Sequence, residues 1–309
     1  MSVPGPFLPG SRVGFIGLGA MGGGMARCVM RRGFALTVFA RHSEAVQALV
    51  EAGAQAAESA AAVGRHASLV FLSLPDAAAV DDALFGPEGL VRTLAAGSCV
   101  VDTSTIAATS AREFGARLRA QGIWFLDAPV SGGQAGANDG TLGCMVGGDA
   151  DALAASREAL GAFCKTITHA GPLGAGQTIK ACNQVAVAGA LLGVADALTL
   201  ARVQGVDPML MRDVLLGGAA RSFSLEKHAP RVIEGKFTPG FRAHLMRKDL
   251  RLALETARSG GAELPSAALA EQLLDALCEG GRSDWDWCAL ALQVQQQAGL
   301  DIPAQREPS

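Results

Sequence analysis

Residues 12–25 read RVGFIGLGAMGGGM, and this stretch decides the fold of the first half of the chain. A short apolar run leads into Gly17, Gly19 and Gly22, which are spaced as G-x-G-x-x-G. In a strand–turn–helix unit the first glycine makes the tight turn, the second lets a pyrophosphate approach the backbone, and the third allows close helix packing. The chain has 39 glycines, so an incidental glycine turn is the alternative. The apolar run before it and the helical pattern after it favour a dinucleotide site.

The residues after the second predicted strand, 35–39, bear on which dinucleotide is bound. An acid at the end of this strand hydrogen-bonds the ribose 2′-hydroxyl of NAD. Here Ala40 takes that place and Arg41 follows it. Because a guanidinium suits a 2′-phosphate, we favour NADP(H), keep NAD(H) open, and note that Arg41 could instead be a plain surface arginine. The predicted cofactor contacts in this region are Gly17, Leu18, Gly19, Ala20, Met21, Gly22 and Arg41.

Further strands alternate with helices, which is the βαβ pattern of a parallel sheet. Ligands bind such sheets beyond the carboxyl ends of the strands, so Leu74, Pro75 and the segment 103–105 are expected near the cofactor. The alternative is that they are plain turns. Ser43 and Asp149 are expected to begin helices as N-caps. The strands are 68–74 and 98–102, and the helices are 77–84 and 107–120.

The next strand, 123–126, runs into a glycine-rich loop that ends at Gly140. Within it, Ser131, Gly132 and Gly133 offer a hydroxyl and consecutive unhindered N–H groups. Such an array can hold a small anion such as a carboxylate. A plain glycine loop is the alternative.

The strand pattern ends at 166–169, and only helical periodicity follows. The first of these helices, 176–204, is apolar nearly all round, as expected for a helix buried between partners. Its apolar core, 185–201, is interrupted by Asp196 and glycines, and we expect it to be too short for a membrane span. The predicted fold class is an α/β Rossmann-type N-terminal domain plus an all-α C-terminal domain, joined by a long interdomain helix. Its predicted domains are 11–172 and 173–300, and its later helices are 209–216, 243–258, 267–278 and 287–298.

Composition excludes several classes of protein. The chain has 309 residues and a net charge of -3, with no basic patch, so a nucleic-acid partner is not expected. Seven cysteines without a C-x-x-C motif indicate reduced thiols and a cytoplasmic location. The first twelve residues lack the apolar core of a signal peptide and are expected to form a flexible leader.

Lys180 is the candidate for acid–base chemistry. The chain contains no tyrosine, which excludes a Tyr/Lys catalytic pair, and it has no Cys/His cluster for a catalytic metal. Gln177, Asn183 and Gln184 share a helix face with Lys180. A lysine in an apolar helix loses hydration, which favours its neutral form and suits proton transfer. On spacing alone, a surface lysine is the alternative.

Five motifs in order resemble the β-hydroxyacid dehydrogenase family, and the resemblance runs from residue 13 to about 292. The resemblance implies a Rossmann-type domain, a long connecting helix, and a helical domain that forms most of the interface of a homodimer or homotetramer. It also implies a small carboxylate-bearing substrate. The motifs are GFIGLGAMGGGM (14–25), LSLPD (72–76), DTSTI (102–106), DAPVSGGQAGANDGTL (127–142) and GAGQTIKACNQ (174–184).

The resemblance also implies roles for individual residues. Lys180 would protonate the aldehyde oxygen as hydride arrives and act as a base in reverse, with Asn183 orienting the substrate. Thr105 would lie between substrate and nicotinamide. Lys248 would lie near the cofactor with Asp249 beside it, an exposed ion pair being the alternative. The implied carboxylate-binding residues are Ser131, Gly132 and Gly133.

Departures from the family pattern refine the expectation. Many members read K-x-x-N-N, and here the second Asn is replaced by Gln184, so Asn183 is assigned the role and Gln184 is kept in reserve. The K-x-x-N-Q form and FTPGF (237–241) resemble the branch that reduces tartronate semialdehyde (2-hydroxy-3-oxopropionate) to D-glycerate. The alternatives are a 3-hydroxyisobutyrate dehydrogenase and, in another class, a non-catalytic NADP(H)-binding protein, against which the retained Lys180 argues.

Overall fold

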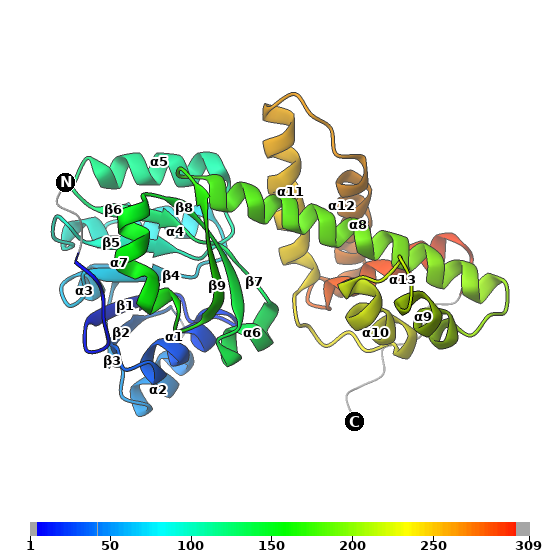
Figure 1. The fold of residues 1–309 in the computed structure, drawn as a ribbon, viewed down its shortest axis with the longest axis horizontal. Coiled ribbons are helices and arrows are strands. Elements are labelled where there is room, and N and C mark those ends of the chain that lie inside the picture. The colour runs from blue at the N-terminus through cyan, green and yellow to red at the C-terminus, as the bar shows by residue number, and fades with distance from the viewer. Residues whose placement is uncertain (1–4, 42, 301–309) are drawn as a thin grey trace. The chain divides into compact units, whose positions relative to one another are not determined.

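The computed structural model describes residues 5–41 and 43–300, which form two compact units (Figure 1). The first unit ends at Lys180 and the second begins at Ala181, inside the helix α8 (Ala175–Val203). The first unit is a nine-stranded sheet with helices, and the second is built from helices. The predicted fold class is confirmed, including the long helix that leaves the α/β unit and enters the helical one.

The sheet follows the order β3-β2-β1-β4-β5-β6-β8-β7, with β9 paired to β8. Strands β1 to β6 pair in parallel, whereas β8 is antiparallel to β6. The parallel strands end at one edge of the sheet, where a ligand is expected. The strands are β1 (Arg12–Ile16), β2 (Ala35–Phe39), β3 (Gln55–Ala56), β4 (Leu69–Leu72), β5 (Cys99–Asp102), β6 (Trp124–Asp127), β7 (Val130–Ser131), β8 (Leu142–Gly148) and β9 (Cys164–Gly171).

Both faces of the sheet are covered, which explains the continuous apolar runs in its strands. Because side chains alternate along a strand, Leu69 and Phe71 of β4 enter one apolar cluster, and Val70 and Leu72 enter another. The first cluster includes residues of α1 and α7, and the second includes residues of α3, α4 and α5. The helices of this unit before α8 are α1 (Gly22–Arg31), α2 (Ser43–Glu51), α3 (Ala60–Gly64), α4 (Ala77–Phe85), α5 (Ala108–Arg119), α6 (Gly133–Asp139) and α7 (Ala150–Leu160).

Two helices of the first unit begin at aspartate caps. Asp149 begins α7, because its carboxylate accepts from the N–H groups of Asp151 and Ala152, and this confirms the predicted cap. Asp76 caps α4 in the same way through Ala79. The side chain of Ser43, the other predicted cap, lies outside what the structure describes.

Two expectations about the first unit are wrong. Phe7 is buried in the core and its N–H donates to the carbonyl of Ala155, so residues 5–12 are no flexible leader. The predicted loop up to Gly140 is the short strand β7 followed by the helix α6. Helix α6 packs against α1 at Gly24, where a Cβ atom would lie 2.7 Å from the Asn138 side chain. This packing stabilises a helix that glycine-rich composition disfavours.

The second unit surrounds an apolar core that contains Leu191, Leu198, Leu250 and Leu274. Helix α8 enters this core through one face. Two π-helical turns, Ser224–His228 and Cys278–Arg282, were not predicted. The remaining helices are α9 (Pro208–Leu216), α10 (Ala229–Glu234), α11 (Ala243–Ser259), α12 (Pro265–Leu277) and α13 (Leu290–Gln297).

The length of α8 corrects a further expectation. The apolar run 185–201 belongs to a helix of 29 residues with a hydropathy of 1.7 over its most apolar window, so it is not too short for a membrane span. In the described part of the chain this is the one helix that is long and apolar enough to cross a membrane. A single such helix is weak evidence for a span, because the core helix of a soluble protein passes the same test.

Candidate active site

The glycine turn after β1 has the stereochemistry that a dinucleotide site requires. Gly17 has a φ of +91°, and a Cβ atom there would collide with the carbonyl oxygen of Ser73. Gly22 opens α1 so close to the turn that a Cβ atom would collide with the carbonyl oxygen of Gly17. At Gly19, by contrast, a Cβ atom would meet nothing within 4 Å. The turn therefore leaves open space at its middle glycine, which fits the approach of a pyrophosphate.

The start of α1 is electrostatically suited to phosphates. Its first turn carries no acidic residue, so no carboxylate of that turn offsets the positive end of the helix dipole. Leu18 is buried, Met21 is half-buried and Ala20 is exposed. Among the predicted cofactor contacts in the turn, Leu18 and Met21 thus also pack into the protein core.

Arg41 lies close to this turn. The N–H of Gly17 donates to the carbonyl of Phe39 at 3.0 Å, so the end of β2 lies beside the turn. Ala40 is half-buried against the core, and Arg41 is exposed. Arg41 therefore lies two residues beyond Phe39, the last residue of β2, whose carbonyl is hydrogen-bonded to the glycine turn.

The ends of β4 and β5 are joined by hydrogen bonds. The N–H of Leu74 donates to Ser104 Oγ at 2.8 Å, and the N–H of Ser104 donates to Asp102 Oδ1 at 2.9 Å. Pro75 is exposed and Thr105 is half-buried. The predicted residues Leu74 and Thr105 thus lie in two segments, after β4 and after β5, that are hydrogen-bonded to each other at one edge of the sheet.

Asp127, at the end of β6, holds the start of α8. Its two carboxylate oxygens accept from the N–H groups of Gly174 and Gln177 at 2.8 and 2.9 Å. Burial raises the pKa of Asp127, and these N–H donors oppose the rise. In the sequence analysis Asp127 belongs to a motif but has no assigned role. Its position directly after a buried strand was the feature that could have indicated one.

Gln177 also ties α8 to the segment around Thr105. Its side-chain Nε2 donates to the Ser104 carbonyl at 2.8 Å, and its Oε1 accepts from the Ile106 N–H at 3.2 Å. The sequence had placed Gln177 on the face of Lys180 without assigning it a function.

The predicted carboxylate-binding residues follow β7. Ser131 is half-buried, while Gly132 and Gly133 are exposed and have positive φ angles of 134° and 65°. A Cβ atom at Gly133 would meet nothing within 4 Å. The segment is therefore accessible to a small ligand.

The predicted catalytic residues lie along α8. Lys180, the last residue of the first unit, is 7% exposed. Asn183 is half-buried and Gln184 is buried. Their i+3 and i+4 spacing from Lys180 places them on its side of the helix.

Inside the second unit, hydrogen bonds and an ion pair link Asn183 to Lys248. Asn183 Nδ2 donates to Gln184 Oε1 at 2.8 Å, and Gln184 Nε2 donates to Asp249 Oδ2 at 2.7 Å. Asp249 Oδ1 pairs with Lys248 Nζ at 3.2 Å. The ion pair that was the alternative for Lys248 is therefore present, with the Lys248 side chain 29% exposed and the Asp249 side chain 3% exposed.

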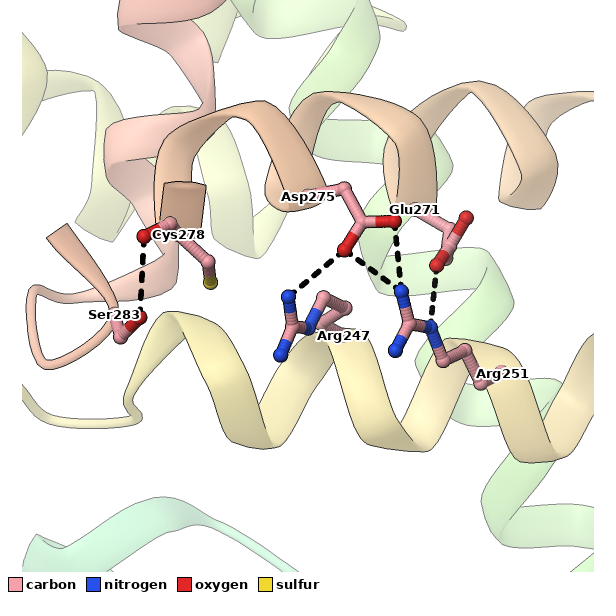
Figure 2. A network of polar contacts seen from close by, with 6 residues as sticks. All are labelled: Arg247, Arg251, Glu271, Asp275, Cys278 and Ser283. Atoms are coloured by element: carbon pink, nitrogen blue, oxygen red, sulfur yellow. Dashed lines mark hydrogen bonds and ion pairs between the residues drawn. The ribbon is translucent and has the colours of Figure 1, made fainter. Parts of the chain in front are cut away.

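Arginine side chains of α11 bond acidic side chains of α12, as Figure 2 shows. Arg247 donates to Asp275 at 2.8 Å, and Arg251 bonds both Asp275 and Glu271. Each such surface pair contributes about 0–1 kcal/mol, so the pairs add modestly to the apolar packing of Met246, Leu250 and Leu254, which holds α11 against the core of the second unit. Over residues 5–41 and 43–300, no group of three His, Cys, Asp or Glu side chains is arranged to hold a metal ion.

Two family models match nearly the whole chain. Residues 12–171 match the NAD binding domain of 6-phosphogluconate dehydrogenase. Residues 174–294 match the NAD-binding domain of NADP-dependent 3-hydroxyisobutyrate dehydrogenase.

Individual relatives agree with this. An NAD-dependent L-serine dehydrogenase of Pseudomonas aeruginosa is 39% identical over 89% of this chain and 95% of its own. A 2-hydroxy-3-oxopropionate reductase of Escherichia coli is 37% identical over 93% of this chain and 98% of its own. A structure of Mycobacterium tuberculosis 3-hydroxyisobutyrate dehydrogenase with L-serine has a TM-score of 0.86 at 30% identity, over 93% of this chain and 99% of its own.

Proposed function

The chain belongs to the β-hydroxyacid dehydrogenase family, and on this premise we propose that it reduces tartronate semialdehyde to D-glycerate with NADPH. The coarser activity follows from the family: the protein is an NAD(P)-dependent oxidoreductase that acts on the CH–OH group of a hydroxy acid. The observation that carries the acid–base chemistry of the proposal is the burial of Lys180 on α8, in the motif GAGQTIKACNQ, and the choice of substrate is supported by the 2-hydroxy-3-oxopropionate reductase relative.

Lys180 is the proton donor in this proposal. When bound, the nicotinamide cofactor would supply hydride to the carbonyl carbon in reduction and would accept it in oxidation. As negative charge develops on the carbonyl oxygen, the ammonium of Lys180 donates a proton to it, and in the reverse direction the neutral amine takes the proton from the hydroxyl group. Because Lys180 is almost fully buried, water competes poorly for this proton.

The substrate is held by groups that suit a carboxylate and an aldehyde. Ser131 Oγ and the N–H groups at Gly132 and Gly133 bind the carboxylate, which their accessibility and positive φ angles support. Asn183 orients the substrate beside Lys180. Thr105 lies between substrate and nicotinamide.

NADP(H) is the proposed cofactor, with NAD(H) as the alternative. The exposed Arg41 beside the glycine turn supports NADP(H), since its guanidinium suits a 2′-phosphate. The NAD-dependent relative in Pseudomonas aeruginosa keeps the alternative in view. Leu74, Pro75 and Lys248 complete the proposed cofactor contacts beyond the turn.

We propose that 11–172 binds the cofactor and that 173–300 serves substrate binding and assembly into a homodimer or homotetramer in the cytoplasm. Large apolar side chains are exposed on the second unit and are available for burial in a subunit interface, which supports the assembly. They are Leu200, Val203, Val206, Leu210, Val214, Phe223 and Leu269. No nucleic-acid or membrane partner is proposed.

An initial-rate panel tests the proposal by following nicotinamide absorbance. Tartronate semialdehyde is paired with NADPH and NADH, and D-glycerate, 3-hydroxyisobutyrate, 4-hydroxybutyrate and L-serine are paired with NADP and NAD. The expected result is the highest kcat/KM for tartronate semialdehyde with NADPH, abolished in Lys180→Ala. Preference for 3-hydroxyisobutyrate would replace the substrate and keep the chemistry. Cofactor binding without turnover of any pair would favour the non-catalytic binder.

A further inference from the structure

Gln177 makes two hydrogen bonds that straddle Thr105. Its Nε2 donates to the carbonyl of Ser104 at 2.8 Å, and its Oε1 accepts from the N–H of Ile106 at 3.2 Å. The partners lie 73 and 71 residues away along the chain. Gln177 is 2% exposed, so water does not replace these bonds easily. A side-chain amide donates through its nitrogen and accepts through its oxygen, and this site uses both functions.

The backbone of Gln177 is fixed as firmly as its side chain. Its N–H donates to Asp127 Oδ2 at 2.9 Å, and the other oxygen of Asp127 accepts from Gly174. One residue therefore connects the end of β6, the segment after β5 and the first turn of α8. Lys180 follows three residues later on the same helix face.

We infer that Gln177 is a positioning residue, which fixes the distance between Lys180 and the segment that carries Thr105. This inference rests on the proposed function, in which Lys180 protonates the carbonyl oxygen and Thr105 lies beside the nicotinamide. Gln177 acts through these two residues and does not itself contact the substrate. Its loss lowers kcat, because a displacement of about 1 Å in such a site reduces the rate by roughly 10²-fold.

The variant Gln177→Glu gives a test that a purely structural role would not pass. When protonated, the glutamic acid has the same donor and acceptor pattern as the amide, with O–H donating to Ser104 and C=O accepting from Ile106. When ionised it only accepts, so it loses the bond to the Ser104 carbonyl and repels that oxygen. The expected ratio of variant to wild-type kcat/KM is highest at the lowest pH and falls as pH rises.

The neighbouring charges set where that fall occurs. Asp127 and Asp102 raise the pKa of an introduced carboxyl, as burial does, whereas Lys180 lowers it. Lys180 and the introduced carboxylate affect each other's pKa, so the ratio to wild type at each pH removes only the part of the Lys180 titration that both proteins share. Gln177→Met, similar in length but without donor or acceptor, is expected to lose about 10²-fold in kcat at every pH with unchanged cofactor affinity. Gln121→Glu, an exposed position in the same unit, is the control for added charge.

Three outcomes overturn the inference. A ratio for Gln177→Glu that does not change with pH is one, and near wild-type kcat in Gln177→Met is another. The third is a fall in activity that coincides with unfolding in circular dichroism, which would make Gln177 a residue of global stability. If Lys180→Ala keeps turnover, the proposed function fails, whatever the Gln177 variants show. If Lys180→Ala is inactive and the pH ratio is flat, only the positioning role fails.

Discussion

The side-chain amide of Gln184 donates to the carboxylate of Asp249 across 2.7 Å, joining α8 to α11 inside the second unit. Its oxygen accepts from Asn183 at 2.8 Å, so both ends of the amide bond within the protein. This arrangement favours Asn183 over Gln184 as the residue that contacts the substrate. It also gives Gln184 a separate task, because Asp249 is buried and relies on hydrogen bonds for its stability.

Substitutions at these two positions are expected to separate activity from stability. Gln184→Leu should lower the free energy of unfolding by about 1–3 kcal/mol, since a buried carboxylate loses a donor. Asn183→Ala should cost less stability, about 0.5–1.5 kcal/mol for one neutral hydrogen bond, and lower kcat/KM by about 10- to 100-fold, through lost substrate orientation. Urea unfolding and initial rates on both variants measure this. The reverse pattern would assign the substrate contact to Gln184.

Alanine substitutions at the first and second glycines of the turn are expected to affect different properties, stability at Gly17 and cofactor binding at Gly19. Gly17→Ala should destabilise the protein by about 1–3 kcal/mol, because its φ of +91° is strained for alanine. Gly19→Ala should leave the unfolding free energy of the cofactor-free protein within about 0.5 kcal/mol, since a Cβ atom meets nothing within 4 Å. It should instead weaken cofactor binding by about 1–3 kcal/mol, as a methyl group overfills the site. Equal stability loss in both would contradict the assignment of Gly19 to the pyrophosphate.

The glycine turn could be predicted from sequence because its requirements are local. The atoms that leave no room for a Cβ at Gly17 and Gly22 belong to the turn itself or to the end of the adjoining strand. The helix α6 could not, because its packing against α1 at Gly24 outweighs a composition that disfavours helix. The task of Gln177 was also beyond sequence reasoning. Its side-chain partners lie more than 70 residues away, and helical spacing shows only that it shares a face with Lys180.

Arg41 is expected to separate the two cofactors. Arg41→Ala should weaken NADPH binding by about 10- to 100-fold, the loss of one hydrogen bond to a charged group, and leave NADH binding unchanged. Fluorescence titration with each reduced cofactor measures this, with Arg157→Ala, exposed on α7, as the control for loss of a positive charge. NADPH affinity should also fall with added salt. Equal effects on NADPH and NADH would remove the argument for NADP(H).

His228 is expected to make the stability of the second unit depend on pH. The ring is buried and packs edge-on against Trp287 and Phe223, at centroid distances of 5.0 and 5.4 Å. Burial lowers the pKa of His228; the Asp286 carboxylate opposes this, and Arg231 adds to it. The folded protein therefore holds the neutral ring at a pH where the unfolded chain, with a histidine pKa of about 6.5, binds a proton.

His228→Phe is expected to reduce this dependence, because phenylalanine keeps the edge-on packing and cannot titrate. The contribution of the neutral ring is fully present above about pH 6.5 and is lost as pH falls towards the lower pKa of the folded state. Each unit of pKa depression corresponds to about 1.4 kcal/mol. On acidification, the free energy of unfolding of wild type should therefore fall more than that of His228→Phe. Urea unfolding at several pH values measures it, with His169→Gln, an exposed position, as the control. Parallel curves for wild type and His228→Phe would mean that the buried ring takes up its proton without disturbing the fold.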